Sequence, residues 1–153
     1  MALAADRKIL GGPQVSPRVL SRFLDAKAGS LTAPEKEEIV SAFTTYGRLT
    51  SIGNLIPFAQ AWHETGGFTS ERWKKSLNPA GVGATNDGAW GQDFASAAEG
   101  IVAQYAHLLA YACKDENMTV PQKILVQLDP RLKPLAESHG RGCAERWVDL
   151  NGK

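Results

Sequence analysis

The chain has 153 residues, of which 43% are hydrophobic and 22% are charged, a composition typical of a folded globular domain and unlike that of a disordered or fibrous chain. Its 17 basic and 16 acidic residues leave a net charge of +1, so no charge excess predicts a nucleic acid or an anionic membrane as partner. We therefore expect one domain over residues 1–153, acting as a monomer.

The sequence shows no address for export and no ligand set for a metal. Residues 1–12 lack the apolar core of a signal peptide, and no apolar run is long enough to cross a bilayer. Cys113 and Cys143 fit no zinc-binding or redox spacing, so we expect buried thiols, with a disulfide between them as the alternative. We expect no metal and no cofactor, and the abrupt end at Lys153 suggests a piece of a longer protein.

Two helices are predicted before residue 50. Ser16 and Pro17 read as an N-cap followed by proline at the first helical position, and the apolar residues behind them predict a helix that ends near Gly29. Thr32–Glu35 has the pattern of a capping box and predicts a second helix that ends near Gly47.

A third helix places one carboxylate in its last turn. Asn54 can cap this helix, and Gly66-Gly67 can terminate it. Apolar residues recur at helical spacing at positions 55, 58, 59 and 62, and Glu64 falls on the opposite side. The negative end of the helix dipole, together with Trp62 and Phe68, favours a protonated carboxyl, as a general acid requires. Glu64 is therefore our candidate catalytic acid, with a solvated surface group as the alternative.

The pattern changes after Asn78, where glycine and small residues replace the helical periodicity. Asp87-Gly88 lies between short runs that contain Val, Thr, Trp and Phe, and an Asp-Gly pair in this setting is typical of a tight turn between two strands. We therefore expect a β-hairpin between Asn78 and Phe94, with Asp87 at its tip.

Helices are predicted again after the hairpin. Ser96–Glu99 is a second capping-box pattern, and it opens a long helix with an apolar side that continues to Ala112. Three shorter helical segments are expected in the tail, at 121–128, 130–138 and 143–150. The predicted fold is mainly α, of the α+β class, with a small β-hairpin lobe flanking a cleft.

Three segments follow one another in an order that resembles a known family. The first is the apolar helix that ends in Glu64 and two glycines, and the second is Asn78-Pro79-Ala80-Gly81-Val82. The third contains Phe94, Ser96, Glu99, Tyr105, Leu108 and Leu109. Together they resemble the peptidoglycan glucosaminidases of glycoside hydrolase family 73, over roughly residues 50–112.

The resemblance implies a lysozyme-like fold and hydrolysis of the N-acetylglucosaminyl β-1,4 bond in bacterial peptidoglycan. The partner would be the glycan strand, and the site of action would be the cell wall, outside the cytoplasm. Because the chain carries no signal peptide, we expect a phage source or a longer parent protein.

Glycoside hydrolysis commonly uses two carboxyl groups. Glu64 would donate the proton, and the candidates for the second group are Asp87, Asp93 and Glu99. We prefer Asp87, because a hairpin tip over the cleft could bring its carboxylate opposite Glu64, although Asp87 also suits a tight turn and Glu99 also completes a capping box. A mechanism assisted by the acetamido group of the substrate would need no second nucleophile.

The resemblance also assigns roles to residues that would contact the glycan. Tyr105 corresponds to a helix tyrosine of the catalytic site, with a core tyrosine as the alternative. Asn78 is expected to shape the turn and to line the cleft. The aromatic side chains expected to contact sugar faces are Phe68, Trp73, Trp90 and Phe94.

Other functions were compared with this one. His63-Glu64 does not extend to the zinc-protease motif H-E-x-x-H, because Gly67 occupies the position of the second histidine. A lytic transglycosylase or muramidase acting on the same polymer, and a non-catalytic glycan-binding module, stay open as alternatives.

Overall fold

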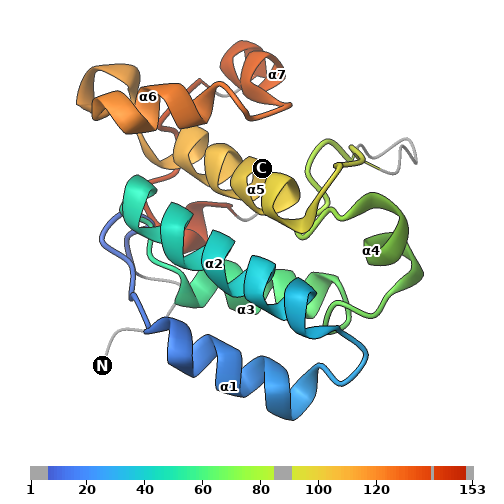
Figure 1. Ribbon diagram of the computed structural model, residues 1–153. Coiled ribbons are helices and arrows are strands. Elements are labelled where there is room, and N and C mark those ends of the chain that lie inside the picture. Colours follow the sequence, from blue (N-terminus) through green and yellow to red (C-terminus); the bar gives the residue numbers. More distant parts are fainter. Residues whose placement is uncertain (1–6, 85–90, 139, 151–153) are drawn as a thin grey trace.

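The computed structural model describes residues 7–84, 91–138 and 140–150 and shows stacked helices (Figure 1). The longer helices are α1 (Pro17–Lys27), α2 (Ala33–Thr50), α3 (Leu55–Glu64) and α5 (Ala97–Ala112). The shorter ones are α4 (Glu71–Ser76), α6 (Val120–Val126) and α7 (Leu132–Ser138), with 3-10 turns η2 (Asp115–Asn117) and η3 (Trp147–Leu150). Helix α5 packs against α2, α6 and α7, and α1 packs against the other side of α2.

The core lies where α2, α3 and α5 meet. Phe43 of α2 contacts Phe58 of α3 and Tyr105 of α5 edge to face, with ring centroids 5.3 and 6.0 Å apart. All three side chains are buried, so this aromatic cluster joins the three helices. The buried residues of α3 are Pro57, Phe58 and Ala61. Half of the apolar stripe expected to face the core is exposed instead, at Leu55 and Ala59.

Local capping signals are largely confirmed. Thr32 and Glu35 form the reciprocal capping box at the start of α2, and Ser96 accepts a hydrogen bond from the Glu99 N–H at the start of α5. The Glu99 carboxylate, however, accepts from the Ala95 N–H. Asn54 stands at the N-cap of α3, but its side chain is bonded to the backbone of Val15. The reciprocal capping box expected at Ser96 is therefore not formed, and Glu99 binds the backbone one residue before the N-cap.

The prediction of a β-hairpin lobe is wrong, because the described residues contain no β-strand. Gly81, Gly83 and Gly91 have φ values of +62°, +80° and +82°, which an extended strand cannot accommodate. The Val82 carbonyl accepts from the Gln92 N–H at 3.0 Å, so the two sides of the segment meet as a looped turn. The fold is mainly α, and the tip of the predicted hairpin, including Asp87, lies outside the described residues.

The two ends of the described chain meet beside η3. Lys8 and Arg146 form an isolated antiparallel bridge, and the Ile9 N–H donates to the Glu145 carbonyl at 2.9 Å. Cys113 is buried, Cys143 is half-buried, and both thiols are free. Among the described residues, no helix is both long and apolar enough to cross a membrane.

Candidate functional site

Glu64 is the last residue of α3 and its side chain is 56% exposed. The nearest ionisable partner in the described chain is His63, whose Nδ1 lies 4.0 Å from the Glu64 carboxylate. A carboxylate that is neither buried nor engaged by a short ion pair has no evident structural task. Glu64 is therefore free to meet a ligand at the end of the helix.

The chain turns sharply after Glu64, as the two glycines predicted. Gly66, Gly67 and Phe68 all have positive φ, at +60°, +73° and +60°. The Gly67 N–H donates to the Trp62 carbonyl at 2.7 Å, and the Thr65 hydroxyl donates to the Ala61 carbonyl at 2.7 Å. A Cβ on Gly67 would approach the Trp62 ring to 3.0 Å, so the turn also requires glycine for space.

Two aromatic residues expected to contact sugars are buried. Phe68 is 1% exposed and Trp73 is 4% exposed, and their ring centroids lie 4.9 Å apart. They support the turn after Glu64 from within. Phe94 is half-buried, and Trp90, like Asp87, lies outside the described residues.

Tyr105 is also completely buried. Its hydroxyl donates to the carbonyls of Gly53, at 2.9 Å, and Phe43, at 3.2 Å. Burial raises the pKa of this phenol well above its ordinary value, because an ionised phenolate would lose its hydration there. This environment supports the alternative of a core tyrosine over contact with a glycan.

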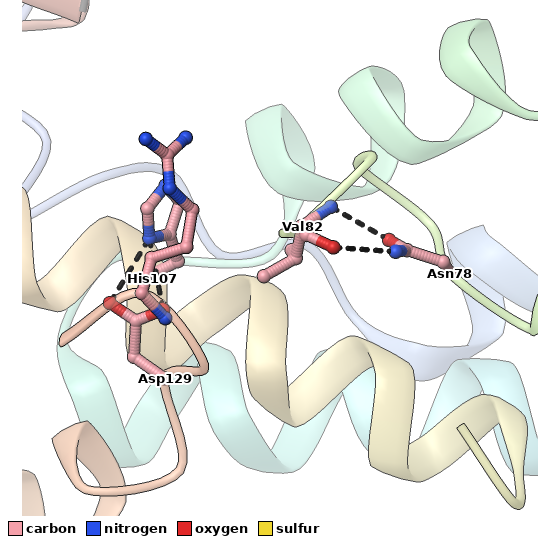
Figure 2. A network of polar contacts seen from close by, with 5 residues as sticks. Asn78, Val82, His107 and Asp129 are labelled. Atoms are coloured by element: carbon pink, nitrogen blue, oxygen red, sulfur yellow. Dashed lines mark hydrogen bonds and ion pairs between the residues drawn. The ribbon is translucent and has the colours of Figure 1, made fainter. Parts of the chain in front are cut away.

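Asn78 shapes the loop after α4 by binding backbone atoms. Its side-chain Oδ1 accepts from the Val82 N–H at 2.9 Å, and its Nδ2 donates to the Val82 carbonyl at 2.9 Å (Figure 2). The same Nδ2 also donates to the Gln92 carbonyl at 3.0 Å. The side chain is buried and joins both ends of the segment that was expected to be a hairpin. The predicted turn-shaping role of Asn78 is thus visible in these contacts.

A polar cavity of about 220 Å³ lies between this loop, α3 and α5. Residues from all three elements line it, among them Gln60, Gly81, Val82, His107, Tyr111 and Arg131. Gln60 precedes Glu64 by four residues in α3, so the two side chains lie on one face of the helix, one turn apart. Glu64 is not among the lining residues, and α3 reaches the cavity through Gln60, one turn before Glu64.

His107 and Asp129 form the most strongly organised polar pair at the cavity. Both carboxylate oxygens of Asp129 lie 3.0 Å from Nδ1 of His107 (Figure 2), and one also accepts from the Arg131 N–H at 2.9 Å. Asp129 is buried, while the His107 side chain is 17% exposed. The carboxylate thus engages Nδ1 and leaves Nε2 as the ring nitrogen available to a ligand.

Tyr111 and Arg131 complete the polar wall. The Tyr111 ring packs edge to face on His107, with centroids 4.8 Å apart. Burial raises the pKa of the Tyr111 phenol, and the neighbouring positive charge of Arg131 opposes that shift. The guanidinium of Arg131 has no hydrogen-bond or ion-pair partner among the described residues.

The residues His107, Asp129 and Arg131 were not among the predicted site residues. A signal was present, since Asp129-Pro130-Arg131 is typical of a turn in which an aspartate accepts from the N–H two residues on. His107 is a polar residue in an otherwise apolar stretch of α5. Their pairing across 22 positions, however, depends on how α5 and the chain after α6 pack.

Comparisons with known proteins add little to this geometry. No protein-family model matches the chain, and no solved structure matches it significantly. The chain is similar to a protein of Borreliella burgdorferi described as an uncharacterized protein, with 36% identity over 103 residues. That alignment covers 64% of this chain and 44% of the relative, so the chain spans less than half of the relative's length.

Proposed function

We propose that this chain is a peptidoglycan hydrolase of the glucosaminidase type, in which Glu64 protonates the leaving glycosidic oxygen. The proposal is carried by one observation: the helix that ends in Glu64, through Gln60, and the loop that begins at Asn78, through residues 80–82, line the same cavity. These are two of the three segments that resemble the glucosaminidases. The third segment leads into α5, whose residues 107, 108 and 111 also line the cavity.

The position of Glu64 suits a general acid that acts on a polymer. The carboxyl lies at a helix end whose backbone Thr65 and the glycine turn hold in place. Its exposure lets a long strand reach it without threading into the protein. A bound strand would then exclude water from the carboxyl and from the bond to be cleaved.

The proposal for the second catalytic group depends on its position in the sequence. Asp87 stays our candidate for a carboxylate opposite Glu64. Among the described residues that line the cavity, none is acidic. This observation favours a second candidate function, a lytic transglycosylase, because that reaction proceeds with a single carboxyl group and no attacking water.

The direct test is Glu64→Gln, with Glu71→Gln as the matched control. Glu71 is an exposed carboxylate on α4 whose only ion pair is to Lys74 at 2.9 Å in the described structure, so its loss removes the same charge at little structural cost. We expect Glu64→Gln to lose at least ~100-fold of the rate at which glycan fragments are released, and Glu71→Gln to keep that rate. Full turnover by Glu64→Gln would exclude Glu64 as the acid.

Mass spectrometry of the released fragments separates the reactions. A reducing N-acetylglucosamine end supports the proposed hydrolase, a reducing muramic acid end indicates a muramidase, and an anhydro-sugar end indicates a transglycosylase. Asp87→Asn, compared with Asp93→Asn, tests the second carboxylate. If Glu64→Gln and the wild type bind peptidoglycan equally and neither releases fragments, the chain is a binding module.

A further inference from the structure

The cavity lined by Gln60 of α3 presents hydrogen-bond donors and positive charge to a ligand. Arg131 contributes a guanidinium that has no partner among the described residues, and Gln60 contributes an amide. No described lining residue is acidic. A planar guanidinium offers two parallel N–H groups, an arrangement that matches the two oxygens of a carboxylate.

Asp129 is close to this cavity, but its charge is already engaged. It is buried, and its oxygens accept from His107 and from the Arg131 N–H, while Asp129 itself is not among the lining residues. The contact fixes the His107 ring and leaves Nε2 for a ligand.

We propose that this cavity is a carboxylate-binding subsite, in which the Arg131 guanidinium holds an acidic group of a peptide stem while Glu64 faces the glycan. The inference rests on the proposed function, because the peptide stems of peptidoglycan carry free carboxyl groups next to the glycan. The cavity volume of about 220 Å³ is below the roughly 300 Å³ of a typical small-ligand pocket, so it suits one substituent of a larger ligand.

With this subsite, the chain would distinguish peptide stems by their free carboxylates in addition to binding the glycan. Strands whose stems carry free carboxylates would bind more tightly than strands whose stems are amidated. Chitin oligomers, which carry no carboxylate, would not use the subsite. Glycan cleavage itself would not depend on Arg131 when the substrate lacks a carboxylate.

The test measures the binding of a muramyl dipeptide with a free terminal carboxyl and of its carboxamide, by calorimetry. We expect the wild type to bind the acid at least about tenfold more tightly than the amide, and added salt to reduce this preference. Arg131→Gln should abolish the preference for the acid. Arg131→Lys should keep only part of it, because lysine lacks the two parallel N–H groups of the guanidinium. Arg22→Gln removes the same charge from an exposed position of α1 and should leave the preference intact.

Two further measurements keep the outcomes distinct. Acetate alone should compete weakly, and acetate binding as tight as that of the dipeptide would overturn the assignment to a peptide stem. Equal binding of acid and amide by the wild type, or a preserved preference in Arg131→Gln with an unchanged thermal midpoint, would overturn the subsite. Glu64→Gln should keep the acid preference, so loss of turnover and loss of the preference report on separate proposals.

Discussion

The side chain of Asn78 binds both backbone polar groups of Val82, accepting from its N–H and donating to its carbonyl, each at 2.9 Å (Figure 2). Val82 lines the polar cavity, and its carbonyl also accepts from Gln92. One buried amide therefore sets the shape of the loop that forms a wall of the candidate site. Replacement of Asn78 would take this partner from the Val82 N–H and the Gln92 carbonyl, while the Val82 carbonyl would keep the Gln92 N–H.

We expect Asn78→Ala to lower the free energy of unfolding by about 2 to 4 kcal/mol, because a buried group left without a hydrogen bond costs roughly 1 to 3 kcal/mol. Urea denaturation followed by circular dichroism measures the change. Asn117→Ala, at an exposed position of η2, is the control and should shift stability by less than ~0.5 kcal/mol. Equal effects of the two substitutions would show that the loop does not depend on the amide.

Gly100 brings the start of α5 against the chain after α4. A Cβ at this position would lie 2.0 Å from the Leu77 carbonyl oxygen and 3.0 Å from Pro79. Alanine is the better helix former by about 1 kcal/mol, yet here we expect Gly100→Ala to destabilise the protein by roughly 1 to 3 kcal/mol because backbone must move. Gly29→Ala is the matched control, since nothing lies within 4 Å of its Cβ position, and it should be neutral or slightly stabilising. The thermal midpoints of the wild type and the two variants measure this difference.

Tyr105→Phe tests whether the buried tyrosine serves packing or catalysis. Removal of the hydroxyl frees the carbonyls of Phe43 and Gly53, so we expect a loss of about 1 to 2 kcal/mol in the free energy of unfolding. Turnover per folded molecule should stay unchanged. Tyr46→Phe removes a hydroxyl that has no hydrogen-bond partner in the described part of the chain, and its effect should be below ~0.5 kcal/mol. A large drop in the turnover of a fully folded Tyr105→Phe variant would indicate a catalytic role for Tyr105.

Alkaline pH should destabilise the protein through the same tyrosine. Burial raises the pKa of Tyr105 in the folded state, whereas an unfolded tyrosine titrates near its ordinary pKa of about 10. Above that pH the unfolded chain loses a proton that the folded chain retains, so stability falls by up to ~1.4 kcal/mol per pH unit until the folded pKa is reached. Denaturation curves between pH 8 and 11 measure the slope.

Tyr105→Phe should reduce this alkaline slope, and the remainder should come from groups such as Tyr111, whose pKa burial also raises. A variant slope identical to that of the wild type would mean that Tyr105 ionises in both states alike.

Features that depend on neighbours in sequence were predictable from sequence. The capping box at Thr32, the N-cap at Ser96 and the glycine turn after Glu64 each depend on hydrogen bonds or backbone angles within a few residues. The same local logic placed Glu64 in the last turn of its helix. The prediction of the hairpin was wrong, because an Asp-Gly pair predicts only a turn. The flanking glycines adopt positive φ and prevent extended strands on either side.

The tertiary structure alone decided which side chains reach a ligand. Phe68, Trp73 and Tyr105 have the chemistry of a glycan site, but packing of α3, α4 and α5 buries all three. The pairing of His107 with Asp129 and the cavity next to Arg131 arise from segments that only the folded chain brings together. Sequence therefore determined where helices begin and end and where one carboxylate stands, while long-range packing determined which groups surround it, because burial depends on contacts between distant segments.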